Sequence, residues 1–293
     1  MYKFDIARKC GRPPYDAVLM LKVLVLQIFY NLYDDQSEFQ IRDRYSFCRF
    51  LSLSPDGKVP DTKAIWVFRE RFKKLELFDK FFTELLAQID AAGFTACKGQ
   101  IADAAFIPTP KERDSREENA RIQAGEIPED RSESRRRQKD VDARWTQKHG
   151  NSHDAYKNHI RVDNPHKVIH HYAVTSTEVH DSQVFEQLLD ESSTSAVVWA
   201  ESAYRDKARE QVLAHANFRS RIYRETTRGR PLSKRAQKAH RKPSKVRSQV
   251  ENVFAQQVDR LIRTMSQARA AVKIGFVNLL YNMCRYAWLA ATG

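Results

Sequence analysis

Three acidic residues, far apart in the sequence, each interrupt a segment in which an isolated carboxylate is hard to explain structurally. Asp103 lies inside the apolar run QIADAAFI, Glu201 closes the apolar run AVVWAES, and Glu251 lies in the basic, helix-like stretch KVRSQVENVFAQQV. Two strands and a helix that each carry one carboxylate can converge on divalent cations. The chain is therefore expected to place these two strands side by side beneath that helix.

Helical spacing of apolar residues predicts four helices in roughly the first hundred residues. The expected N-terminal residues are Asp16, Asp34 or Asp35, and Asp61 or Thr62, and the fourth helix covers Leu77 to Ala92. Helices joined by short polar turns are compatible with a helix-turn-helix-like DNA-binding domain, and almost equally with a plain helical bundle. The third helix carries the basic residues that we expect to contact DNA, which are Arg69, Arg71, Lys73 and Lys74.

The pattern changes from helix to strand at Gly99. QIADAAFIP has strand character, and YKNHIRVD and KVIHHYAVTSTEV are typical of two strands joined by the turn DNPHK. AVVWAES is a further short strand, and the end of the chain returns to helix. We therefore predict a mixed α/β fold with two domains, residues 1–98 and 99–293, the second with a charged insertion at about residues 108–150.

The charge of the chain favours a polyanionic partner. The net charge is +13 and the pI about 9.6, and the span from Arg219 to Arg247 is dense in Lys and Arg with Glu225 as its only acid. A solvated charged face is the structural alternative. Acids normally intersperse such a face, however, so we favour contact with phosphates.

Other features indicate a cytoplasmic protein without a membrane partner. The four cysteines are scattered and form no CxxC pair, and the N-terminus lacks an apolar signal-peptide core. The most apolar stretch, AVLMLKVLVLQIFYNL, is interrupted by Lys22 and Gln27. We expect a nucleoid-associated location in the bacterial cytoplasm and no small-molecule substrate.

Three converging carboxylates permit phosphoryl transfer with two metal ions, which lie about 3.5–4 Å apart in such sites. Mg²⁺ prefers octahedral oxygen coordination, so carboxylates are its expected ligands. Each acid also has a structural alternative, because Asp103 could end its strand and Glu201 could cap a turn. Glu251 could pair with Arg247 on an exposed helix face. The order and context of the three acids favour the metal site.

From Gly11 to about Trp288 the chain resembles the bacterial insertion-sequence transposases of family five, within the DDE superfamily. The motifs that carry the resemblance occur in the family's order: GRPPYDAVLMLKVLVLQ, VPDTKAIWVFRERF, DSREENARIQAGEIPE, RQKDVDARW, YKNHIRVD, VHDSQ, SAYR and KVRSQVENVFA. The resemblance implies an RNase H-like catalytic domain and Mg²⁺ as cofactor, with Mn²⁺ as an alternative. It also implies a homo-oligomer bound to double-stranded DNA at transposon ends and target.

The resemblance assigns roles to particular residues. It places the family's first catalytic Asp at Asp103, its catalytic Glu at Glu251, and the Arg of its R-x-x-x-E pattern at Arg247. The second catalytic Asp falls within WAESAYR, where this chain has Glu201. The extra methylene moves the carboxylate by more than about 1 Å, and a misplacement of about 1 Å can cost about 10²-fold in rate.

Two functions follow from this difference. The first is an active transposase that cleaves and joins DNA at terminal inverted repeats. The second is a catalytically impaired transposase that binds DNA ends or acts as a repressor, and a soluble nuclease is a weaker third. In all of them the expected DNA contacts in the second domain are Lys157, His159, Arg221, Lys245 and Arg247.

Two other signals compete with this interpretation. The histidines from His153 to His180 suggest a zinc or HNH-nuclease site, but they lack HxxxH spacing on a helix and accompanying cysteines. Asp181 is an alternative second carboxylate, ranked below Glu201 because it lies at a strand-to-loop junction. Trp145, in the polar insertion, fits the main interpretation instead, because it could stack on a flipped base at a transposon end.

Overall fold

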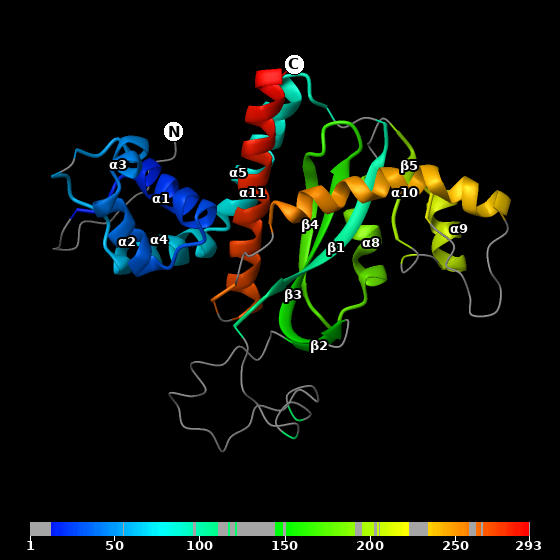
Figure 1. Ribbon diagram of the computed structural model, residues 1–293, viewed down its shortest axis with the longest axis horizontal. Coiled ribbons are helices and arrows are strands. Elements are labelled where there is room, and N and C mark those ends of the chain that lie inside the picture. The colour runs from blue at the N-terminus through cyan, green and yellow to red at the C-terminus, as the bar shows by residue number, and fades with distance from the viewer. Residues whose placement is uncertain are drawn as a thin grey trace. The chain divides into compact units, whose positions relative to one another are not determined.

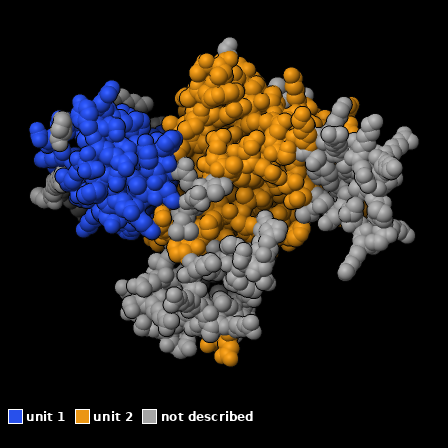
Figure 2. Space-filling model, viewed as in Figure 1, with its two compact units in different colours: residues 1–81 blue, residues 82–293 orange. Residues whose placement is uncertain are grey.

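The structure of the protein, a computed structural model, describes residues 13–54, 56–95, 98–110, 117, 121, 144–148, 151–190, 195–201, 204, 206–222, 234–257, 262–264 and 266–292. For residues 144–148, 151–154 and 234–244 it describes only the backbone. The chain forms two compact units, residues 1–81 and 82–293 (Figure 2). The boundary that the sequence predicts, after residue 98, lies further along the chain and stays a prediction.

The first unit consists of helices that begin where the sequence supplies caps. They are α1 (Ala17–Phe29), α2 (Asp34–Asp43), α3 (Tyr45–Leu51) and α4 (Thr62–Lys74), and α5 (Leu77–Ala91) begins in this unit. Asp16 accepts hydrogen bonds from two backbone amides of α1 at 3.0 Å, and Asp61 accepts one from α4 at 2.7 Å. These predicted caps are confirmed. The second predicted helix is split, because Arg44 has an extended backbone between α2 and α3.

A largely buried ion pair links three helices of the first unit. Arg69 on α4 donates from its two terminal nitrogens to the two carboxylate oxygens of Asp34 on α2, each at 2.8 Å. It also donates to the amide oxygen of Gln27 on α1 at 3.1 Å. The side chains of Arg69 and Asp34 are 14% and 20% exposed, so this bidentate pair fixes α4 against α1 and α2.

The second unit is built on one mixed sheet. Its strands are β1 (Gln100–Pro108), β2 (Arg144–Lys148), β3 (Asn151–Asp163), β4 (Ile169–Ser176), β5 (Val197–Trp199) and β6 (Arg219–Ser220). β3 is antiparallel to β1, β2 and β4, whereas β5 is parallel to β1, and β6 to β5. α8 (Asp181–Leu188) precedes β5 and α9 (Lys207–His215) precedes β6, as parallel strands require crossover helices. The order β4-β3-β1-β5-β6 confirms the predicted mixed α/β, RNase H-like fold.

Helices cover both faces of this sheet (Figure 1). On one face α8 packs Phe185 against Ala102 of β1. On the other face α11 (Gln267–Thr292) packs Ile274 against Ile107 of β1, and α10 (Lys234–Ala255) reaches the same strand. Because side chains alternate along a strand, Asp103 shares the α10 and α11 face with Ile107.

Gly99 allows the start of β1 to approach β5 closely. Its φ is +98°, and a Cβ atom at this position would lie 2.7 Å from the carbonyl oxygen of Val197 and against the ring of Trp199. Only glycine adopts this conformation without strain and leaves room for the neighbouring strand. The pairing of β1 with β5 therefore depends on this residue.

The hairpin predicted at DNPHK is confirmed, because β3 and β4 flank this turn. Asp163 closes it by accepting the backbone amides of His166 and Val168 at 2.7 and 2.8 Å. The predicted charged insertion at about residues 108–150 lies mostly outside the described residues.

Across the described ranges, no single helix is long and apolar enough to cross a membrane. α1 and α2 pass that test only as a pair, with a bend of 102° between them.

Candidate active site

The parallel pairing of β1 with β5 brings two of the predicted acids together. Ile101 pairs with Trp199, and Asp103 and Glu201 each follow their strand's paired residue by two positions. Residues two apart along a strand lie on the same face of the sheet. Asp103 and Glu201 lie at equal distances beyond a paired position, so both carboxylates lie on the face covered by α10.

Arg247 on α10 joins these two carboxylates. Its Nη2 atom lies 3.1 Å from Asp103 Oδ2 and 3.4 Å from Glu201 Oε1, and its Nε donates to the same Asp103 oxygen at 3.2 Å. The exposed fraction of the side chain is 7% for Asp103, 21% for Arg247 and 46% for Glu201. One guanidinium thus lies between a buried and a half-exposed carboxylate.

Burial and charge act differently on the two partners, Asp103 and Arg247. It raises the pKa of Asp103 to about 6, although the charge of Arg247 and a hydrogen bond from the Ala104 amide oppose this shift. Burial alone would lower the pKa of Arg247, but the surrounding carboxylates outweigh it and raise that pKa above its ordinary value. Desolvation of the Asp103 carboxylate therefore outweighs the stabilisation that Arg247 gives to its ionised form.

The third predicted acid, Glu251, lies one helical turn beyond Arg247 on α10 and is exposed. Its charge contributes to the raised pKa of Arg247. In the described part of the chain, no group of three or more His, Cys, Asp or Glu side chains is placed to hold a metal ion. The residues nevertheless have the ligand atoms that a hard divalent cation prefers, which are carboxylate oxygens. Two such oxygens, from Asp103 and Glu201, already converge on one positive group.

A hydrogen-bonded turn holds Glu201. The Tyr204 amide donates to the Glu201 carbonyl at 3.0 Å, and the fully buried Tyr204 ring packs on Phe185 with ring centroids 5.0 Å apart. Arg209 of α9 donates to the carbonyls of Tyr204 and Ser182, each at 2.8 Å. Tyr204 and Arg209 therefore anchor the turn to α8 and α9. Neither residue was predicted to have a role, although the sequence shows an aromatic three residues after Glu201.

His159 lies on the opposite face of the sheet from Asp103. It pairs with Ala104, the neighbour of Asp103 in β1, so alternation directs it toward the α8 side. The side chain has no exposed surface, and its Nε2 lies 2.9 Å from the Thr175 hydroxyl. In this conformation, burial removes His159 from the surface that DNA can reach.

Lys157 and Asp181 pair with each other on this second face. Lys157 Nζ lies 2.9 Å from Asp181 Oδ1 and donates to the Val179 carbonyl at 2.7 Å. Lys157 is 9% exposed, so its charge is directed mainly at Asp181 inside the fold. Asp181, the alternative second carboxylate, has Lys157 as its ion-pair partner, whereas Glu201 is the acid that shares Arg247 with Asp103.

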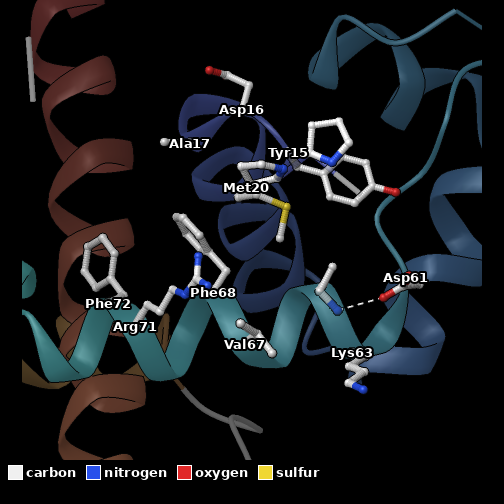
Figure 3. Close-up of a pocket in the computed structure, with 13 residues that line it drawn as sticks. Tyr15, Asp16, Ala17, Met20, Asp61, Lys63, Val67, Phe68, Arg71 and Phe72 are labelled. Carbon is white, nitrogen blue, oxygen red and sulfur yellow. Dashed lines mark hydrogen bonds between the residues drawn. The ribbon is translucent and has the colours of Figure 1, made fainter. Parts of the chain in front are cut away.

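The basic residues predicted on α4 lie in different surroundings. Arg69 belongs to the ion pair with Asp34 described above, and Lys73 pairs with Glu70 at 2.8 Å. Arg71 and Lys74 are exposed. Arg71 also lines a pocket of about 570 Å³ between the start of α1 and α4, together with Met20 and Phe68 (Figure 3).

Two further predicted DNA contacts are exposed on the second unit. Arg221 follows β6, and its backbone amide donates to the Val198 carbonyl at 2.8 Å. Its side chain is exposed. Lys245 is exposed on α10, two residues before Arg247. The side chain of Trp145 lies outside the described residues, so its predicted base contact stays a prediction.

The fold and this site define an RNase H-like protein with one carboxylate on β1 and a second just after the adjacent parallel strand β5. Residues 98–283 match the family described as "Transposase DDE domain", and residues 1–71 match "Transposase domain (DUF772)". The chain therefore belongs to the DDE transposases, a family that uses divalent metal ions.

Two solved structures show weak similarity. The "Crystal structure of the Mos1 Strand Transfer Complex" is 10% identical, over 97% of this chain and 82% of that chain, with a TM-score of 0.27. The "Mos1 transposase paired-end complex with left transposon end" is 10% identical, over 96% and 82%, with a TM-score of 0.23. The family assignment rests on the two family matches.

Proposed function

We propose that this protein is an insertion-sequence transposase of family five that binds the terminal inverted repeats of its element and cleaves and joins DNA there. The observation that supports the proposal is the convergence of Asp103 and Glu201 on one positive group at the β1–β5 pairing. In a member of the DDE transposase family, such a carboxylate pair is suited to hold the catalytic cation.

Asp103 and Glu201 would hold Mg²⁺, or Mn²⁺ as an alternative, with Glu251 as the third ligand from α10. Held there, such a cation would supply activation of the attacking water or 3′-hydroxyl and stabilisation of the leaving oxygen. The chain itself contributes position: β1 buries and orients Asp103, and the turn closed by Tyr204 orients Glu201. No covalent link between enzyme and DNA is needed, because water and the freed 3′-hydroxyl are the nucleophiles.

Exposed basic residues supply the proposed contacts with DNA phosphates. In the first unit they are Arg71 and Lys74, and in the second Arg221 and Lys245. Such contacts make affinity strongly dependent on salt. We propose double-stranded DNA as the partner, a homo-oligomer as the bound form, and the bacterial cytoplasm, on the nucleoid, as the location.

A catalytically impaired protein that binds DNA ends or acts as a repressor is the second candidate. It is favoured by the Glu at position 201, where the family resemblance expects Asp. The longer side chain is half exposed and reaches Arg247 at 3.4 Å. A carboxylate displaced by about 1 Å can still bind a cation while slowing the chemical step about 10²-fold.

One assay separates the two candidates. A plasmid carrying the coding sequence with its own flanking DNA is incubated with purified protein and Mg²⁺ or Mn²⁺, and cleavage at the ends is measured. Wild type, Glu201→Asp and Asp103→Ala are compared. Cleavage by the wild type that Asp103→Ala abolishes supports the active transposase. Cleavage only by Glu201→Asp supports the impaired one, and no cleavage by either, with intact binding, contradicts an enzymatic role.

A further inference from the structure

Arg247 has the geometry of a cation bound between two ligands. A single nitrogen, Nη2, lies within 3.4 Å of an oxygen from each of Asp103 and Glu201. These oxygens come from β1 and from the residue two positions after β5, while the guanidinium comes from helix α10. A divalent cation that used both oxygens would have to lie in the space between them, where the guanidinium now is.

The ion pair with Asp103 consists of two charged contacts that another cation would have to replace. Nε and Nη2 both approach Asp103 Oδ2, at 3.2 and 3.1 Å, and the carboxylate is 7% exposed. Ion pairs shielded from water are less screened than surface pairs. Arg247 itself is only partly buried, so its side chain has a route away from the site toward solvent.

We propose that Arg247 is the internal counterion of the Asp103–Glu201 pair, and that a divalent cation must displace its guanidinium before it can use both carboxylates. This inference rests on the proposed function in one respect, because it takes the carboxylate pair to be a metal site. It adds that cation binding requires a rearrangement within the site, in which one positive group replaces another.

The position of Glu251 agrees with this exchange. Glu251 lies one turn from Arg247 on the same helix and is exposed, outside any three-acid cluster among the described residues. While Arg247 holds α10 to the two strand carboxylates, the third acid stays apart from them. Release of Arg247 would remove its ion pairs between α10 and the two carboxylates.

The test measures binding of Mn²⁺ alone to the full chain, without DNA, from the free Mn²⁺ signal in electron paramagnetic resonance. Wild type is compared with Arg247→Gln, which keeps a polar side chain and loses the charge. Arg247→Lys keeps the charge but cannot approach Asp103 with two nitrogens, and Asp103→Asn identifies the binding that belongs to this site. Thermal melts with EDTA confirm that each variant folds.

Arg285→Gln is the matched control. Arg285 lies on α11 in the same unit, donates to the His166 carbonyl at 2.5 Å, and stacks on Trp288 with its guanidinium carbon 4.4 Å from the ring centroid. This variant makes the same change in net charge without touching the carboxylate pair. It should bind Mn²⁺ as the wild type does.

Arg247→Gln is expected to bind Mn²⁺ more tightly than wild type, by on the order of 10-fold, because the cation no longer has to break a charged hydrogen-bonded pair. Arg247→Lys should fall between the two, and Asp103→Asn should abolish the gain. Equal or weaker binding by Arg247→Gln, with wild-type binding that depends on Asp103, overturns the inference and leaves the proposed function standing. Absence of Asp103-dependent binding in both proteins overturns both.

Discussion

The backbone amide of Tyr204 donates to the carbonyl of Glu201 at 3.0 Å, so the residue that closes the turn is also the one whose ring is buried in the core. The position of a half-exposed acid is thereby tied to hydrophobic packing beneath the sheet. A change in the packing of this aromatic ring should therefore affect the site as well as stability.

Tyr204→Ala should lower the free energy of unfolding by about 3–5 kcal/mol, because it removes a fully buried aromatic ring. Tyr204→Phe should stay within about 1 kcal/mol of wild type, since the buried hydroxyl has no hydrogen-bond partner in the described structure. Urea unfolding followed by circular dichroism checks both. A large loss in the Phe variant would show that the hydroxyl has a partner.

His159 should make the protein sensitive to acid. Burial lowers the pKa of this histidine from 6.5 to about 4, even though Asp181 opposes the shift. Between these two pH values the unfolded chain binds a proton that the folded chain does not, so stability falls as the pH falls from 6.5 to 4.

The comparison is with His159→Gln, which cannot titrate and can still bond to Thr175. From pH 7 to pH 4 the wild type should lose about 2–3 kcal/mol more unfolding free energy than this variant. Other titrating groups are common to both proteins and cancel. Parallel stability curves across this range would show that His159 titrates normally.

Gly99→Ala should destabilise the second unit by more than Gly93→Ala does. Both glycines have positive φ, +98° and +91°, but a Cβ at Gly93 would meet nothing within 4 Å. Gly93→Ala therefore measures backbone strain alone, about 1 kcal/mol. Gly99→Ala adds a clash with Val197 and Trp199 and should cost about 2 kcal/mol or more. Equal losses of unfolding free energy in the two variants would mean that β5 can shift to accommodate the added methyl group.

Arg69 and Asp34 should be coupled in stability. In a double-mutant cycle with Arg69→Gln and Asp34→Asn, the bidentate pair should give a coupling energy of about 1–2 kcal/mol. Thermal or urea unfolding of the four proteins measures it. A coupling near zero would mean that the pair contributes nothing to the first unit, and would leave Arg69 available to DNA.

Arg71 and Lys74 should affect DNA binding and not stability. Both are exposed, so Arg71→Gln and Lys74→Gln should each change the unfolding free energy by less than about 0.5 kcal/mol. If each contacts one phosphate, each substitution should reduce the slope of log affinity against log salt by about 0.9. Fluorescence anisotropy with a labelled duplex provides the measurement. An unchanged slope in both variants would place the DNA elsewhere.

The sequence predicted the fold class because strand and helix patterns are local, and it predicted the convergence of Asp103 with Glu201 from the order and context of the acids. Strand alternation and the helix caps at Asp16 and Asp61 are encoded within a few residues. The position of Arg247 between the acids was not predicted, since the R-x-x-x-E spacing fixes only where it lies on its helix. Its partners depend on how α10 packs over β1, which is a long-range property.

His159 was predicted to lie near DNA, but its side chain is buried. Its basic character and its strand suggested contact with DNA, but the direction of its side chain depends on its register with β1. Once Ala104 is known to be its partner, alternation places it on the face opposite Asp103. The pairing register, and not residue type, decides whether a strand residue of β3 faces the acids.

The alternation along β1 limits how this strand can change. Asp103 faces α10, while its neighbours Ala102 and Ala104 face the core beneath α8. Insertion or deletion of a single residue before Asp103 would turn the carboxylate into that core and present an alanine to Arg247. Changes of two residues would keep the face but shift the acid along β5, away from Glu201. Length variation is therefore tolerable only outside this strand, where the chain has loops.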